Sequence, residues 1–94
     1  MTEEQLAYFK RLLAEPGVSG YESGAQAVWR ERVQVAAEAV REDAQGSAVA
    51  VVNEAADNRV MLVGHIDEIG LIVKHVADNG FVHVASGGGV RRHI

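Results

Sequence analysis

The chain has 94 residues, enough for one small domain, and 48% of them are hydrophobic and 23% charged, which excludes a disordered polypeptide. Acidic residues outnumber basic ones 13 to 9, so neither nucleic acid nor an anionic membrane is expected as the main partner. Without cysteine there is no thiolate metal site, and any metal must be bound by histidine and carboxylate side chains. No signal peptide or membrane span is predicted, and the absence of disulfides fits a cytoplasmic protein.

Two helices are predicted in the first half of the chain. Thr2 and Gln5 form a capping box at the start of the first helix, and Pro16 ends it. Ser19 and Glu22 offer a second capping box for a longer helix. Its apolar residues recur at helical spacing and form one stripe: Ala25, Trp29, Val33, Ala36 and Val40.

Strands are predicted after residue 41. A turn at 43–46 precedes a strand at 47–52, and a polar loop follows at 53–58. Val60–Val63 is apolar at every position, which is typical of a strand covered on both faces by helices. The chain is therefore predicted to be an α/β protein with helices packed on a mixed β-sheet.

A β-hairpin is predicted near the C-terminus. Residues 70–76 form one strand, Asp78-Asn79-Gly80 is a strong turn signal, and residues 81–84 return as the partner strand. Residues 86–89 are too rich in glycine to continue that strand. The chain then stops at Ile94 with nothing that closes the last element, which fits either an interrupted domain or a frayed tail.

The polar residues that follow the apolar run 60–63 are the best candidates for chemistry. Residues two apart in an extended chain point the same way, so His65 and Asp67 share a face, whereas Glu68 faces the other way. A metal-binding histidine commonly has such a carboxylate beside it, which sets its tautomer. The spacing alone favours a structural His–Asp hydrogen bond over a metal site. The placement raises the weight of the metal hypothesis, because three polar groups crowd the end of an apolar strand, where burial without a partner is costly.

The remaining histidines carry less information. His75 and His83 lie on the two arms of the predicted hairpin and could meet across it, and His93 lies in the tail. Gly87-Gly88-Gly89 could cradle a phosphate, but no helix signal follows, and a simple bend is the better interpretation.

Several blocks of the sequence together resemble the tetrahedral aminopeptidase family, which includes glutamyl and deblocking aminopeptidases. The segment 15–22, Glu-Pro-Gly-Val-Ser-Gly-Tyr-Glu, is similar to the opening motif of that family. The segment 60–73 looks like its first metal motif, and Asp78-Asn79-Gly80-Phe81 and Gly87-Gly88 follow in the family's order and spacing. The resemblance covers essentially the whole chain.

The resemblance implies a cytoplasmic exopeptidase with two zinc or cobalt ions, acting on peptide substrates, whose dimers often assemble into dodecamers. His65 would bind one metal, and Asp67 would be the catalytic-site residue that supports it. Glu68 matches a recurring position, but its role is left open. The family's catalytic domain would account for residues 1–70, and residues 71–94 would lead into its dimerisation domain.

The resemblance implies that the family's other metal ligands and its general base would lie beyond Ile94. One histidine supplies at most one ligand of a zinc site, so we expect this chain, an N-terminal fragment on this interpretation, to bind metal weakly and to be inactive alone. Two alternatives stay open: a non-catalytic module that binds a protein partner through an exposed hairpin edge, and a related hydrolase acting on another amide.

Overall fold

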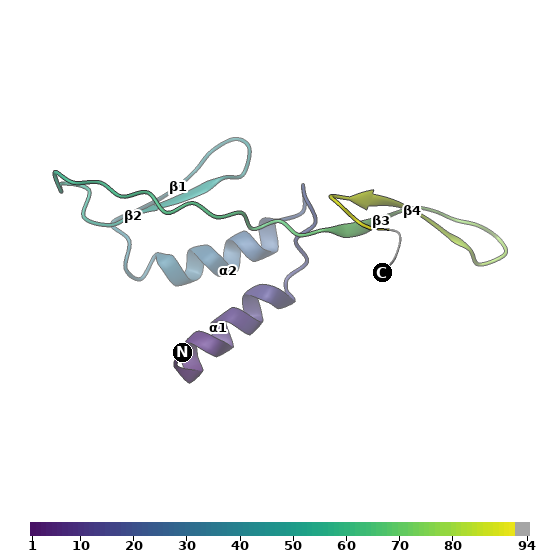
Figure 1. Ribbon diagram of the computed structural model, residues 1–94, viewed down its shortest axis with the longest axis horizontal. Coiled ribbons are helices and arrows are strands. Elements are labelled where there is room, and N and C mark those ends of the chain that lie inside the picture. The colour runs from purple at the N-terminus through teal and green to yellow at the C-terminus, as the bar shows by residue number, and fades with distance from the viewer. Residues whose placement is uncertain (92–94) are drawn as a thin grey trace.

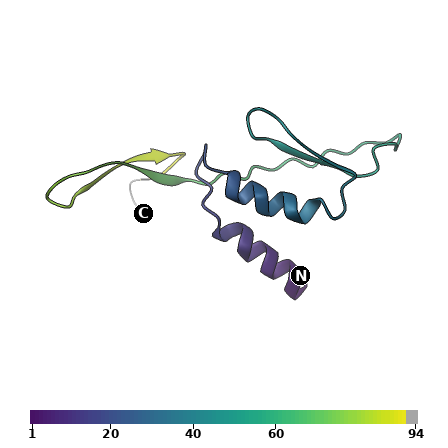
Figure 2. The same cartoon turned by 180° about the vertical axis from the view of Figure 1, so that it is seen from behind.

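A computed structural model describes residues 1–91 and shows two helices and two antiparallel hairpins, an α/β arrangement (Figure 1). In chain order the elements are α1 (Glu3–Ala14), α2 (Ser23–Val33), β1 (Ala39–Glu42), β2 (Ala48–Val51), β3 (Gly70–Val76) and β4 (Val82–Gly87). The helices and the β1–β2 hairpin lie together, and the β3–β4 hairpin projects away from them (Figures 1 and 2). Neither helix has the length and apolar character needed to cross a bilayer.

The predicted first helix is confirmed, together with its cap. The Gln5 amide donates to the Thr2 hydroxyl at 3.2 Å, and the Thr2 amide donates to the Gln5 side chain at 2.8 Å. These two bonds satisfy backbone donors that a helix start otherwise leaves open. The helix ends at Ala14, shortly before Pro16.

The second helix is shorter than predicted and starts differently. It begins at Ser23, its N-cap Glu22 makes no side-chain capping bond, and it ends at Val33. The prediction of Ser19 as the N-cap was therefore wrong, as was the continuation of the helix to Val40. Ala39–Glu42 instead form the strand β1, because their backbone groups pair with β2.

The small core of the described chain lies under α2. Ala25 and Val28, both on α2, are its two buried hydrophobic residues, with exposed fractions of 3% and 4%. The helix packs against α1 and against β2. Trp29, predicted to be a core residue, is half-buried.

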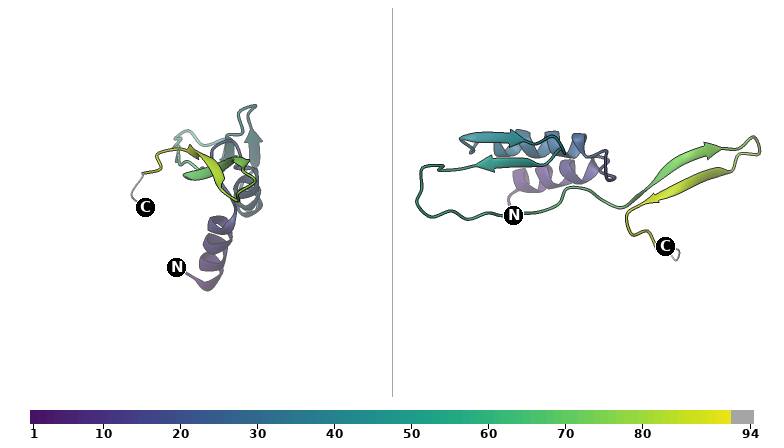
Figure 3. Two further views of the ribbon diagram at one scale, coloured as in Figure 1. Left: turned by 90° about the vertical axis from the view of Figure 1, so that its right-hand side faces the viewer. Right: turned by 90° about the horizontal axis from the view of Figure 1, so that it is seen from above.

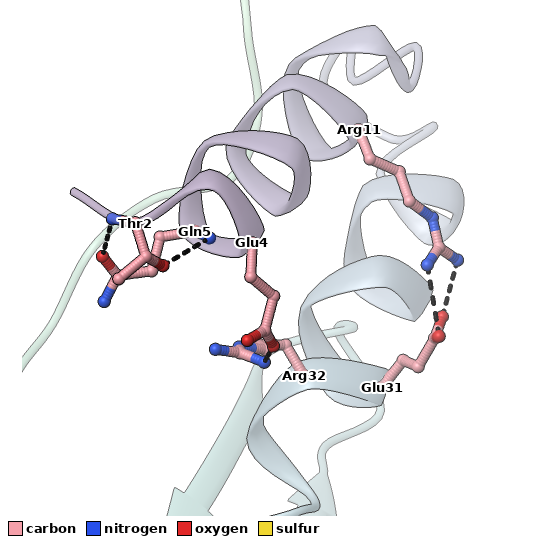
Figure 4. Close-up of polar contacts among 6 residues, drawn as sticks. All are labelled: Thr2, Glu4, Gln5, Arg11, Glu31 and Arg32. Atoms are coloured by element: carbon pink, nitrogen blue, oxygen red, sulfur yellow. Dashed lines mark hydrogen bonds and ion pairs between the residues drawn. The ribbon is translucent and has the colours of Figure 1, made fainter.

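Ion pairs join the two helices along their exposed sides (Figure 4). The two terminal guanidinium nitrogens of Arg11, Nη1 and Nη2, donate to the Glu31 carboxylate, at 3.1 and 2.6 Å, and Arg32 donates to Glu4 at 2.6 Å. The hydrogen bond and positive charge of Arg11 lower the pKa of Glu31, and Glu31 in turn raises the pKa of Arg11. These ion pairs connect α1 and α2 along their exposed sides, where each contributes little to stability.

The β1–β2 hairpin turns at the predicted place. The Asp43 carboxylate accepts hydrogen bonds from the amides of Gln45 and Ser47, both at 2.9 Å. Gly46 has a φ of +89°, which favours glycine in this turn. The register aligns Ala39 with Val51 and Glu42 with Ala48.

The β3–β4 hairpin confirms the predicted turn at residues 78–80, where Gly80 has a φ of +85°. Its register pairs Val76 with Val82 and Gly70 with Gly87, with an irregularity between Val73 and His75. The strand β4 therefore extends beyond residue 84, and the expectation that residues 86–89 could not continue it was wrong for Ser86 and Gly87. Pairing with Leu71 and Gly70 holds these two residues in the ladder.

The prediction of a buried strand at Val60–Val63 was wrong. The segment is part of a long stretch without secondary structure that connects the two hairpins (Figure 3). Its four side chains have exposed fractions of 87%, 82%, 93% and 84%. Within residues 1–91 no strand pairs with this segment, so it has neither a ladder nor a covering layer.

Candidate metal centre

The candidate site forms where the loop after α1 meets the segment before β3. Val18 and Glu68 make a parallel bridge. The Glu68 amide donates to the Gly17 carbonyl at 2.7 Å, and the Gly17 amide donates to the Glu68 carboxylate at 3.3 Å. Two segments about 50 residues apart in sequence are thus joined by their backbones, and the functional side chains lie beside this junction.

Glycines allow the close packing around this junction. A Cβ atom at the buried Gly17 would lie 3.3 Å from the Ile66 carbonyl oxygen, which is a tight contact. The Val18 side chain lies against Gly70 and Gly87, which are paired in the β3–β4 ladder. A Cβ atom at Gly87 would come within 2.7 Å of a Val18 methyl group. The loop can therefore sit on the hairpin only because these positions lack side chains.

His65 and Asp67 lie in contact, as their spacing predicted. His65 Nδ1 is 3.0 Å from Asp67 Oδ1 and also 3.0 Å from the Asp67 backbone oxygen. Because a carboxylate and a carbonyl can only accept, Nδ1 must carry the proton. The lone pair of the neutral ring is then on Nε2, the atom left for a metal, and the His65 side chain is 86% exposed.

The Asp67 carboxylate is held on both of its oxygens. Its Oδ2 accepts a hydrogen bond from the Ser19 hydroxyl at 2.6 Å, while Oδ1 faces His65. The Ser19 hydrogen bond lowers the pKa of Asp67 most strongly; partial desolvation opposes this shift, and His65 adds to it. Asp67 is therefore an ionised acceptor at neutral pH.

Two contacts of the site were not predicted from the sequence. Ser19 was assigned to a helix cap, although it belongs to the opening motif whose role the pattern left unexplained. Glu68, whose role was left open, reaches across to the Gly17 amide and makes no hydrogen bond with His65 within residues 1–91.

Two other histidines, His75 and His83, lie on the β3–β4 hairpin and not at this junction. His75 and His83 do meet across the β3–β4 hairpin, with ring centroids 5.7 Å apart. Of residues 87–89, Gly87 ends β4 and Gly88 makes the bend that follows it, where the Val90 amide donates to the Gly88 carbonyl at 3.0 Å. His93 lies outside the described residues.

The residues present fit a metal only in part. The donor pattern at His65, with Nδ1 hydrogen-bonded to a carboxylate, is the one that metal-binding histidines commonly show. Within residues 1–91, however, no group of three or more histidine, aspartate or glutamate side chains is arranged to hold an ion. The site contains one candidate metal ligand, His65, and the carboxylate that supports it, Asp67.

Comparisons with known proteins agree on the class of enzyme. The sequence profile of the M42 glutamyl aminopeptidase family matches residues 46–94. The lysyl aminopeptidase of Pyrococcus furiosus is 35% identical over 82 residues, which cover 86% of this chain and 23% of that protein. A protein of Acetivibrio thermocellus, assigned as an aminopeptidase, is 29% identical over 91 residues, 97% of this chain and 27% of that protein.

The fold is also that of a solved relative. The TET aminopeptidase from a marine sediment archaeon of the Thaumarchaeota superposes with a TM-score of 0.84 at 28% identity, over 93% of this chain and 25% of that one. The chain belongs to the M42 glutamyl aminopeptidase family. It spans about a quarter of the length of the relatives that it matches.

Proposed function

We propose that this chain forms part of a metal-dependent aminopeptidase, in which His65 binds a divalent metal ion through Nε2 and Asp67 positions it. The observation that carries the proposal is the contact of His65 Nδ1 with Asp67 Oδ1 at 3.0 Å on an exposed histidine. That contact fixes the tautomer a metal ligand needs and raises the basicity of the free nitrogen.

The family supports the remaining parts of the proposal. M42 peptidases depend in general on metal ions, and we propose two ions per site, zinc or cobalt. When bound, such ions activate a water molecule for attack on the peptide bond next to the free N-terminus of a peptide substrate. With one ligand among residues 1–91, we expect the 94-residue chain to show no turnover alone.

The proposed domain division and assembly follow from the same resemblance. We propose that residues 1–70 belong to the catalytic domain and that residues 71–94 lead into a dimerisation domain. The projection of β3–β4 away from the helices supports this boundary (Figure 1). A homo-oligomer, from dimer to dodecamer, and a cytoplasmic location are proposed for the intact enzyme.

A graft tests the function. The 82 matched residues of the Pyrococcus furiosus lysyl aminopeptidase are replaced by the corresponding stretch of this chain, and hydrolysis of lysine p-nitroanilide is measured with added cobalt or zinc. We expect metal-dependent turnover that is abolished by His65→Ala. The matched control His83→Ala, on the hairpin, should leave turnover within about twofold.

A graft that folds and assembles like the parent enzyme but shows no turnover would contradict the proposal. So would turnover that survives His65→Ala. Either result would favour the alternative of a non-catalytic protein-binding module.

A further inference from the structure

The opening motif of the sequence reaches the candidate metal centre through one side chain. Ser19 Oγ donates to Asp67 Oδ2 at 2.6 Å, although the two residues are 48 positions apart. The other oxygen of the same carboxylate faces His65 Nδ1 at 3.0 Å. A continuous chain of hydrogen bonds therefore runs from the Ser19 hydroxyl through Asp67 to the imidazole.

The geometry points to Ser19 as a positioning residue, which holds Asp67 in the rotamer that orients His65 for metal binding. This inference rests on the proposed function of His65. The Asp67 carboxylate is partly exposed, at 41%, so without a second partner it could rotate and bond water instead of the ring. The Ser19 hydroxyl donates to the second carboxylate oxygen, Oδ2, and thereby opposes this rotation.

The position of Ser19 is fixed by backbone contacts of its own loop. Glu68 donates its amide to the Gly17 carbonyl at 2.7 Å, and Tyr21 donates its amide to the Val18 carbonyl at 2.7 Å. These bonds hold the loop on both sides of Ser19 independently of its side chain. Removal of the hydroxyl should therefore release Asp67 without releasing the loop, which separates a positioning role from a structural one.

The charge pattern agrees with this role. The Ser19 hydroxyl has one proton to donate, and a carboxylate oxygen can only accept it. Hydrogen bonds to an ionised oxygen are shorter and stronger than neutral ones, and 2.6 Å is within that range. Serine thus supports the carboxylate without neutralising its charge, so Asp67 keeps the negative charge that favours a protonated Nδ1.

The experiment uses the 94-residue chain labelled with ¹⁵N. The first readout is the tautomer of His65, measured by NMR at pH 8. The second is the apparent affinity for Zn²⁺ at the His65 ring, followed by titration. Four proteins are compared: the unaltered chain, Ser19→Ala, the rescue variant Ser19→Thr, and Ser47→Ala, a matched control in the β1–β2 turn.

We expect the unaltered chain to have its proton on Nδ1, and Ser19→Ala to populate the other tautomer. Zinc affinity at His65 should fall by about threefold to tenfold, at or below the lower end of the range for partners of metal-binding histidines. Ser19→Thr, which keeps the hydroxyl, should restore both readouts, and Ser47→Ala should change neither. Hydrogen exchange of the Glu68 amide should be the same in all four.

Unchanged tautomer and affinity in Ser19→Ala would overturn the inference. So would loss of protection at the Glu68 amide in that variant, since Ser19 would then act by holding the loop. If the unaltered chain binds no zinc at His65, the proposed function fails, while the tautomer comparison still decides the role of Ser19.

Discussion

At the scale of single residues, the site depends on two glycines without side chains as much as on its polar side chains. Val18 fits against the hairpin because Gly70 and Gly87 face it without side chains. The His65–Asp67 contact was predictable, because residues two apart in an extended chain share a face. The Ser19 contact was not, because a local pattern cannot show which segment 48 residues away will lie beside it.

Gly87→Ala should displace Val18 and the loop that carries Ser19. The new Cβ would lie 2.7 Å from a Val18 methyl group, and overpacking of this kind costs about 1–3 kcal/mol. The matched control is Gly89→Ala, whose Cβ would meet nothing within 4 Å. Urea unfolding compares the two variants. We expect Gly87→Ala to lower the free energy of unfolding measurably and Gly89→Ala to change it by no more than about 0.5 kcal/mol. Equal stabilities would show that Val18 does not pack on the hairpin.

At the scale of elements, local signals predicted α1, both turns and β3 well. The capping box, Asp43 in one turn and Gly80 in the other act within a few residues. The end of α2 could not be predicted in the same way, because Val40 fits a helical stripe as well as a strand. Pairing with Ala50 across the β1–β2 ladder, a contact outside the local pattern, decides in favour of the strand.

The Arg11–Glu31 pair should make the packing of α1 on α2 sensitive to acid. The pKa of Glu31 is lowered in the folded chain from its ordinary value of 4.5, so its contribution to stability is present above that value. The contribution is lost as the pH falls through the lower, folded pKa. Because the pair is exposed, the effect is small.

Urea midpoints of the unaltered chain and of Glu31→Gln, measured between pH 7 and pH 2, check this prediction. The unaltered chain should be the more stable at pH 7, and the difference should vanish at the acid end. A difference that persists at pH 2 would contradict it. So would a Glu31→Gln difference at pH 7 that is equally large in a chain lacking Arg11, because the ion pair would then not be its cause.

At the scale of the whole molecule, the described chain has a large surface for its size. The radius of gyration is 17.6 Å, against about 12 Å for a typical domain of this length. The accessible surface is 8110 Å², against about 5300 Å² for a typical monomer of this mass. The sequence pattern at Val60–Val63 is that of a buried strand, but burial needs covering elements that residues 1–91 do not supply.

Two substitutions compare the exposed run with the core. Leu62 is 93% exposed, so Leu62→Lys should change the free energy of unfolding by less than about 0.5 kcal/mol and reduce self-association. Val28 is 4% exposed, so Val28→Ala should cost about 1–3 kcal/mol. Urea unfolding and sedimentation velocity measure both effects. A large destabilisation by Leu62→Lys would mean that the segment is buried in solution.

The central claim is that His65 is one ligand of a metal site that residues 1–91 do not complete. The most direct measurement is a zinc titration of the 94-residue chain, read at the His65 imidazole by NMR. Four-ligand zinc sites bind with about 10–16 kcal/mol, so one ligand corresponds to a dissociation constant of roughly millimolar size. We predict that zinc shifts the NMR signal of His65 Nε2 with a dissociation constant of that size. His65→Ala should abolish this response. Binding of two ions per chain at micromolar concentration, or no response at His65, would contradict the account.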